Sequence, residues 1–153
     1  MRILVCGGRA FADYGWLTHV LDAYLAEASL SVAKLELIGG GARGADSLAH
    51  RWATERQIPF HEFKARWDDT KHPQADVRFN RKDGKPYNAA AGFIRNQRMV
   101  DEGRPDIVIA FPGGGGTRDM MLRATEAGVP VRDMRLEDGS KNPTPACPPA
   151  ACS

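Results

Sequence analysis

The chain has 153 residues, of which 42% are hydrophobic and 26% are charged, and this balance fits one globular domain with a hydrophobic core. Its longest apolar runs, residues 3–6 and 107–111, are far below the roughly 20 residues that cross a bilayer, so we expect a cytoplasmic protein with no membrane-spanning segment. The net charge of +2 indicates no partner by itself, and the three cysteines lack metal-ligand spacing, so we expect no metal and no cofactor.

Short apolar runs bounded by glycine or proline predict strands, and apolar residues three and four apart predict helices between them. In chain order these are a strand at 3–6, a helix at 16–25, a strand at 35–38, a helix at 45–53, strands at 59–63 and 107–111 separated by a helix at 91–102, a last helix that carries Met120 and ends near Gly128, and a strand at 129–131. The alternation predicts an α/β fold, a single Rossmann-like domain at residues 1–136 with a doubly wound parallel sheet and helices on both faces.

Residues 64–90 interrupt this alternation and predict a long loop or partly ordered excursion. Residues 64–98 hold nine basic and four acidic residues, a local net charge of +5 in a nearly neutral chain. The aromatic residues among them could stack on a nucleic-acid base or anchor the loop to the core; they are Trp67, Phe79, Tyr87 and Phe93. Residues 137–153 are rich in proline and alanine and predict a disordered tail.

Ten of the 16 glycines fall in three loops that each follow a predicted strand. The loops are Cys6-Gly7-Gly8-Arg9, Gly39-Gly40-Gly41-Ala42-Arg43-Gly44-Ala45-Asp46 and Pro112-Gly113-Gly114-Gly115-Gly116-Thr117. A glycine-rich turn into a helix offers bare N–H donors and the positive end of the helix dipole, which together favour a phosphate. In a doubly wound sheet the three loops converge on one edge. Neither the P-loop nor the dinucleotide Gly-x-Gly-x-x-Gly pattern is present, which disfavours a P-loop NTPase and classical hydride transfer.

Five polar residues near these loops each have two interpretations. Thr117 could cap the last helix or bind a phosphate through its hydroxyl. Asp46 and Asp119, which we expect in first helical turns, could complement the helix dipole or bind a ribose. Arg95 and Arg98 share one helix face and could bind phosphate or lie in solvent.

Four motifs together resemble a known family. They are Ile3 to Phe11, Gly39 to Asp46 with Trp52-Ala53, Ala91 to Met99, and Pro105-Asp106 to Thr117. In this order they resemble the YspA-type, cpYpsA-related branch of the SLOG superfamily, over roughly residues 1–134. The resemblance implies a nucleotide-binding Rossmann-like unit related to the LOG phosphoribohydrolases and to the DNA-processing protein DprA. Their hallmark Pro-Gly-Gly-x-Gly-Thr-x-x-Glu matches here except that Met120 stands at the glutamate.

The resemblance implies a site that holds a phosphorylated nucleoside or an ADP-ribose-like ligand, in a sensor or sequestering protein of the kind found in nucleotide signalling and phage or bacterial immunity. The candidate ligand-binding residues are Gly7, Gly8, Arg9, Gly40, Gly41, Arg43, Gly44, Asp46, Arg95, Asn96, Arg98, Pro112, Gly113, Gly114, Gly115, Gly116 and Thr117. Two alternatives stay open: an N-glycosidase with Arg95 and Asp119 as catalytic residues, and single-stranded nucleic-acid binding by the basic segment. We also expect a homodimer, as in LOG relatives.

Overall fold

A computed structural model describes residues 1–135, so the predicted tail at residues 137–153 lies outside the described residues. The elements in chain order are β1 (Arg2–Cys6), α1 (Tyr14–Glu27), the short 3₁₀ helix η1 (Val32–Lys34), β2 (Glu36–Gly39), α2 (Ala45–Glu55), β3 (Phe60–Glu62), β4 (Val77–Phe79), β5 (Pro86–Asn88), α3 (Ala91–Asp101), β6 (Ile107–Ala110), α4 (Gly115–Glu126) and β7 (Val131–Asp133). Five strands form one parallel sheet in the order β3-β2-β1-β6-β7. Within residues 1–135 no helix combines the length and apolarity needed to span a bilayer.

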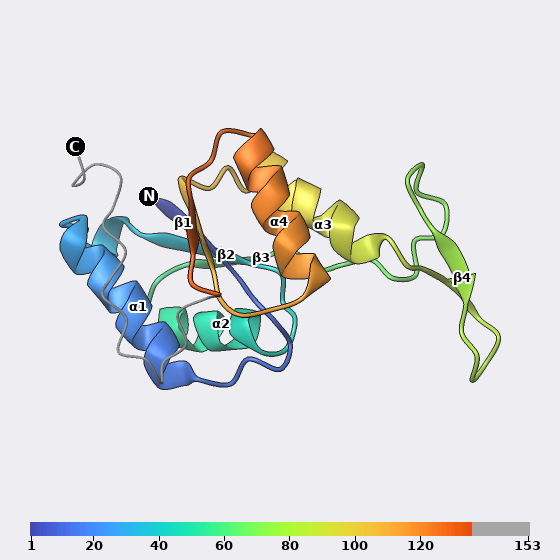
Figure 1. Ribbon diagram of the computed structural model, residues 1–153, viewed down its shortest axis with the longest axis horizontal. Coiled ribbons are helices and arrows are strands. Elements are labelled where there is room, and N and C mark those ends of the chain that lie inside the picture. Colours follow the sequence, from blue (N-terminus) through green and yellow to red (C-terminus); the bar gives the residue numbers. More distant parts are fainter. Residues whose placement is uncertain (136–153) are drawn as a thin grey trace.

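The alternating directions of the strand side chains divide the core into two layers. On β1, Ile3 and Val5 pack with buried residues of α1 and α2, whereas Leu4 and Cys6 pack with buried residues of α3 and α4. Figure 1 shows the two helix pairs on opposite faces of the sheet. The prediction of a doubly wound parallel sheet with helices on both faces is therefore confirmed.

The order of the strands fixes where a ligand can bind. From β1 the chain proceeds through α1 to β2 on one side, and from β6 it proceeds through α4 to β7 on the other side. The loops that leave β1 and β6 therefore diverge at neighbouring strands, which opens a crevice at the carboxyl edge of the sheet.

The predicted excursion at residues 64–90 contains an antiparallel hairpin that the sequence analysis missed. Strands β4 and β5 pair with each other and with no strand of the main sheet, and the hairpin lies far from that sheet (Figure 1). Each strand has only three residues, and all three of β4 are exposed, so no buried apolar run marks them. The turn is closed by the Asn80 N–H, which donates to the Lys85 carbonyl at 2.9 Å, and by Gly84 with φ of 68°.

The last strand begins two residues later than expected, at Val131 instead of Val129. The chain leaves α4 through Gly128, whose φ is 76°, and the Val129 N–H donates to the Ala124 carbonyl at 2.8 Å. Val129 therefore closes the helix instead of starting a strand. Pro130 has no N–H, so regular pairing starts at Val131.

Position 120 tests the second core layer, because Met120 is fully buried beside Leu4, Cys6 and Val108. We expect Met120→Glu to lower the free energy of unfolding by about 3 kcal/mol or more, since it buries a carboxyl without a partner. The control Met120→Leu should cost less than about 1.5 kcal/mol. Urea titrations measure both values, and equal stabilities of the two variants would contradict this placement.

Candidate functional site

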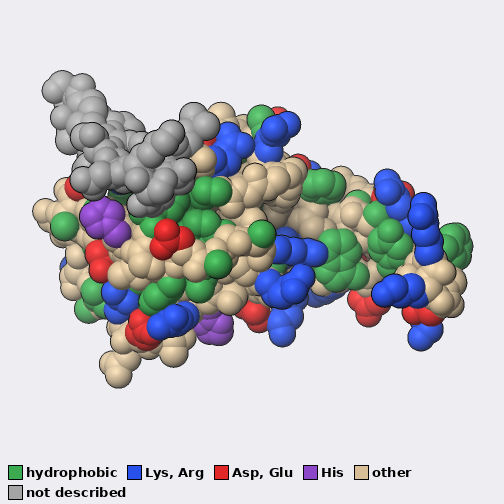
Figure 2. All heavy atoms as spheres, turned by 60° about the horizontal axis from the view of Figure 1, so that its bottom comes forward, with side chains coloured by type: hydrophobic (Ala, Val, Ile, Leu, Met, Phe, Trp, Pro, Cys, Tyr) green, Lys and Arg blue, Asp and Glu red, His purple; other side chains and the backbone are tan. Residues whose placement is uncertain are grey.

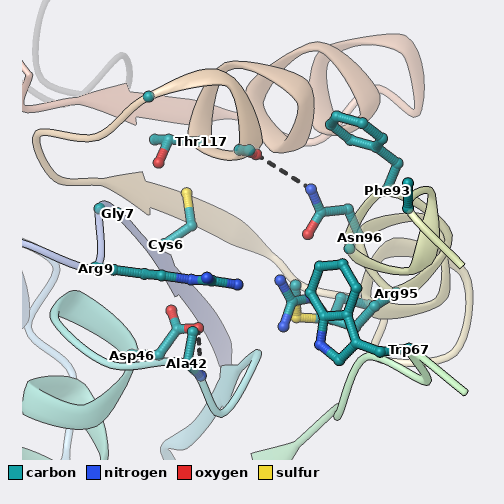
Figure 3. A pocket seen from close by; sticks show the side chains of 16 residues that line it. Cys6, Gly7, Arg9, Ala42, Asp46, Trp67, Phe93, Arg95, Asn96 and Thr117 are labelled. Atoms are coloured by element: carbon teal, nitrogen blue, oxygen red, sulfur yellow. Dashed lines mark hydrogen bonds between the residues drawn. The ribbon is translucent and has the colours of Figure 1, made fainter. Parts of the chain in front are cut away.

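A cavity of about 280 Å³ opens at the carboxyl edge of the sheet, at the crevice between β1 and β6 (Figure 3). It brings together the loop after β1, the loop before α2, the segment before α3, α3 itself and the start of α4. The residues that line it are Cys6, Gly7, Gly8, Arg9, Ala42, Asp46, Trp67, Ala89, Gly92, Phe93, Arg95, Asn96, Met99, Gly114, Gly116 and Thr117. Nine of these are candidates from the sequence: Gly7, Gly8, Arg9, Asp46, Arg95, Asn96, Gly114, Gly116 and Thr117.

The backbone of Gly8 joins the three glycine loops. Its N–H donates to the Pro112 carbonyl at 2.8 Å, and its carbonyl accepts from the Ala45 N–H at 3.2 Å. The loop after β1 is thereby held against both the loop after β6 and the start of α2. The predicted convergence of the loops thus follows from main-chain hydrogen bonds as well as from topology.

The loop glycines fall into two groups according to the space around them. A Cβ on Gly7 would lie 2.5 Å from the Cβ of Ala45, and one on Gly8 would lie 3.0 Å from the Cα of Gly113. Close packing within the protein therefore requires glycine there. At Gly114, Gly115 and Gly116, by contrast, an added Cβ would have no neighbour within 4 Å. Packing within residues 1–135 gives no reason for glycine at these three positions.

The start of α4 presents N–H groups without acceptors in the described part of the chain. Its N-cap residue is Gly114, with no side-chain cap, and the first amide bonded along the helix is that of Arg118, to the Gly114 carbonyl at 3.1 Å. Helix α1 differs, because Asp13 accepts from the Trp16 N–H at 2.9 Å. Of the two interpretations of Thr117, capping of the last helix is wrong, since Thr117 lies inside the helix and Gly114 is its N-cap residue. Thr117 is 4% exposed and lines the cavity (Figure 3).

Asn96 and Asp119 hold the first turns of α4 in place. The amide nitrogen of Asn96 donates to the Gly116 carbonyl at 3.1 Å and to the Asp119 carboxylate at 3.0 Å. Asp119 also pairs with Arg123 at 2.8 Å, and it lies in the second turn of α4, not in the first as expected. Neither Asp119 nor the buried Met120 is among the cavity-lining residues. Met120 therefore points into the core, and the carboxylate of Asp119 is held by Asn96 and Arg123.

Two guanidinium groups face each other across the cavity. Arg9 extends from the loop after β1 and Arg95 from α3, and their ends point toward one another with Asp46 beside them (Figure 3). Arg95 donates to the Gly40 carbonyl at 2.7 Å, while its Nε is buried without a partner in the described residues. With one carboxylate against two cations, this part of the cavity carries an excess positive charge that suits an anion.

Burial and these neighbours shift the ionisation of the cavity residues. Burial raises the pKa of Asp46, against the lowering effect of the Ala42 N–H and of Arg95. Burial likewise lowers the pKa of Arg95, and Arg9 lowers it further, while Asp46 opposes both. The pKa of the Cys6 thiol is raised strongly by burial, so this side chain is a neutral thiol on the cavity wall.

Other candidates lie outside this cavity. Arg98 does not line this cavity, although it lies on the same helix as Arg95. It pairs with Glu102 at 3.3 Å, and its guanidinium lies 5.7 Å from the centre of the Phe63 ring. Arg98 and Arg95 both line a smaller hollow of about 120 Å³. Arg43 lines a separate, adjoining hollow together with Gly40 and Gly41. The remaining candidates, Gly44, Pro112, Gly113 and Gly115, are absent from the cavity wall.

The aromatic part of the wall comes from Trp67 and Phe93, which are 43% and 44% exposed. The sequence indicated both as stacking candidates but not which of the four aromatic residues would reach the glycine loops. Nothing in the sequence marks Ala42, Ala89, Gly92 and Met99 as site residues, because small and apolar side chains are equally typical of a core. Within residues 1–135, no three His, Cys, Asp or Glu side chains come together as a metal site.

Together, the topology, the glycine loops and the facing arginines define a Rossmann-like α/β protein with a cavity at its switch point, and two cations and one carboxylate meet on the wall of that cavity. Residues 1–70 match the family model of the YspA, cpYpsA-related SLOG family. The chain is also 37% identical over 133 residues to the Gene 61 protein of Mycobacterium phage D29. That alignment covers 85% of this chain and 93% of the phage protein. The chain belongs to the YspA, cpYpsA-related SLOG family.

Two solved structures share the fold. DNA processing protein A (DprA) from Streptococcus pneumoniae aligns over 86% of this chain with a TM-score of 0.61 and 20% identity. The protein TM1055 aligns over 85% of this chain and 71% of its own, with a TM-score of 0.51 and 17% identity. This chain spans about half the length of DprA, 49% of it.

Asp46 gives the site a pH dependence. Because its pKa in the folded state lies above the ordinary 3.8, its contribution to stability is complete below that pH and is lost as the pH rises through the folded-state pKa. We expect Asp46→Asn, which cannot ionise, to gain stability relative to the unmodified protein between about pH 4 and about pH 7. Urea unfolding at both pH values measures this change. The exposed N-cap variant Asp13→Asn is the control, and a pH-independent difference for Asp46→Asn would contradict the assignment.

Proposed function

We propose that this protein binds a phosphorylated nucleoside or an ADP-ribose-like nucleotide derivative, as a sensor or a sequestering protein. The observation that carries the proposal is the start of α4, where Gly114, Gly115 and Gly116 leave open space and the N–H groups have no acceptor in the described residues. A phosphate there meets bare N–H donors and the positive end of the helix dipole.

The rest of the wall supports the same ligand. Arg9 and Arg95 face the cavity and form no ion pair among the described residues, and the Thr117 hydroxyl adds another donor. Trp67 and Phe93 offer exposed aromatic faces on which a base can stack. The volume of about 280 Å³ lies near the lower end of ordinary small-molecule sites, roughly 300 Å³. That size suits a mononucleotide or the first half of a larger ligand.

Binding is favoured over bond cleavage because no acid at the two relevant positions, 119 and 120, faces the cavity. The glutamate of the related enzymes is replaced by Met120, which lies in the core, and Asp119 is held by Arg123 and Asn96. To take part in cleavage of a glycosidic bond, the Asp119 carboxylate would have to leave both Arg123 and Asn96. Homodimer formation, a cytoplasmic location and a role in immunity signalling stay expectations from composition and family resemblance.

A substitution at Gly116 tests the phosphate site. Gly116→Ala places a methyl group in open space at the cavity wall, so we expect the fold to keep its stability or gain about 0.5 kcal/mol. The same methyl group should weaken nucleotide binding about tenfold or more, because it blocks approach to the α4 N–H groups. Calorimetry with AMP, ADP-ribose and a cyclic nucleotide measures the affinity. Mass spectrometry of small molecules released from the purified protein identifies a copurified ligand.

The matched control is Gly15→Ala, at the second residue of α1, where an added Cβ meets only the Asp13 carboxylate at 3.6 Å. Gly15→Ala should leave every affinity unchanged. The proposal fails if the unmodified protein binds no nucleotide more tightly than about 1 mM. It also fails if Gly116→Ala binds as tightly as the control does.

The hairpin favours a second candidate function, the binding of single-stranded nucleic acid. Phe79 is 67% exposed and Val77 44% exposed on one face of β4, with Arg78 between them in the strand and Arg81, Lys82 and Lys85 in the turn that follows. Figure 2 shows Lys and Arg side chains interspersed with hydrophobic ones along this projecting part. Basic residues interspersed with an exposed aromatic ring are typical of surfaces that bind single strands.

Phe79→Ala tests this candidate. We expect the affinity for a labelled oligothymidylate to fall about tenfold, because one base loses its stacking partner. The binding of the unmodified protein should also weaken steeply with salt. Fluorescence anisotropy measures both effects, and Leu122→Ala, which removes an apolar residue 58% exposed on α4, is the control. Affinity that is insensitive to salt, or unchanged in Phe79→Ala, would rule the hairpin out as the binding surface.

A further inference from the structure

A second hollow of about 340 Å³ adjoins the main cavity. The two share Arg9, Ala42, Trp67 and Arg95 on their walls, so they form neighbouring compartments of one depression. The second compartment adds Arg43 from the loop before α2 and Lys64 from the segment after β3. Because residues of three separate loops meet here, only the folded chain creates this surface.

Positive charge dominates this second hollow. Its wall carries four cationic side chains, those of Arg9, Arg43, Lys64 and Arg95, and no carboxylate. Arg9 and Arg43 form no ion pair within residues 1–135, and Lys64 has only the Glu62 carboxylate, at 3.5 Å. Lys and Arg side chains also gather where the projecting part meets the body of the protein (Figure 2).

A hollow at the opposite edge of the sheet provides the comparison. There Arg2, Lys34 and Arg104 line the wall together with Glu36 and Asp106, and Arg2 pairs with Glu36 at 2.8 Å. The protein thus balances the charge of that hollow with its own acids. In the hollow beside the main cavity the four cations on the wall outnumber the two acids close to them, Glu62 at Lys64 and Asp46 at Gly40, and this net positive charge suits an anionic ligand.

The boundary between the compartments is the contact of Arg9 with Trp67. The Arg9 guanidinium stands 5.9 Å from the centre of the Trp67 ring. A ligand that extends from the α4 phosphate site into the second hollow therefore passes an arginine and an exposed aromatic face. These two groups suit a nucleotide, whose phosphates and base alternate between charged and stacking contacts.

We infer that the ligand carries two phosphate groups, the first at the start of α4 and the second in the hollow formed by Arg43 and Lys64. The class is therefore a nucleoside diphosphate derivative or a dinucleotide, and not a simple nucleoside monophosphate. This inference rests on the proposed binding of a nucleotide-derived ligand in the main cavity.

Calorimetry with three probes at one ionic strength tests the inference. The probes are AMP, with one phosphate; ADP-ribose, with two adjacent phosphates; and the 5′-phosphorylated dinucleotide pApA, with two phosphates separated by a nucleoside. We expect ADP-ribose or pApA to bind about tenfold or more tighter than AMP. The two-phosphate probe that binds more tightly shows whether the second phosphate is adjacent to the first or separated from it by a nucleoside.

The double variant Arg43→Gln with Lys64→Gln should remove this gain and leave the AMP affinity within about twofold of its original value. The matched control is Lys34→Gln with Arg104→Gln, which deletes the same charge from the hollow at the opposite edge and should change nothing. The inference is overturned if neither two-phosphate probe exceeds AMP, or if the gain survives in the double variant. Failure of all three probes to bind would instead overturn the proposed function itself.

Discussion

The site depends on how closely the loops after β1 and β6 approach each other. Gly8 makes the approach possible, because its N–H bonds to Pro112, its carbonyl bonds to Ala45, and a side chain there would meet Gly113. With these loops in contact, the starts of α2 and α4 open onto one space. Without that contact the same glycine-rich turns would be separate surface loops, and no shared cavity would form.

The electrostatics of the cavity follow from this geometry. Two arginines from different elements are brought face to face, and a single buried carboxylate, Asp46, lies beside them. Burial disfavours the charge on Arg95 and on Asp46 alike. A bound anion would relieve the repulsion between Arg9 and Arg95 and would satisfy the amides at the start of α4. Within residues 1–135 the cavity thus gathers N–H donors that have no acceptor.

The regular part of the fold could be predicted, because periodicity in the sequence reports burial. The strands at β1 and β6 and the helices around Trp16 and Trp52 have continuous or periodic apolar patterns, and each lies in the core. The hairpin at Val77–Phe79 and Pro86–Asn88 could not be found in this way, because exposed three-residue strands leave no such pattern. The prediction that β7 starts at Val129 is wrong because the Val129 N–H donates to the Ala124 carbonyl of α4. The hydrophobicity of the sequence does not indicate that hydrogen bond.

The sequence by itself determined that glycine loops follow the strands of a parallel sheet and that basic residues lie near them, since both properties are local. Tertiary structure decided which of these residues share a space. It placed Arg9, Arg95 and Thr117 at the cavity. It also put Arg98 beside Glu102 and Met120 in the core. Finally, it showed that packing requires glycine at Gly7 and Gly8 but not at Gly114, Gly115 and Gly116. The reason is physical: whether a side chain faces a ligand, an acid or the core depends on neighbours far away in the chain.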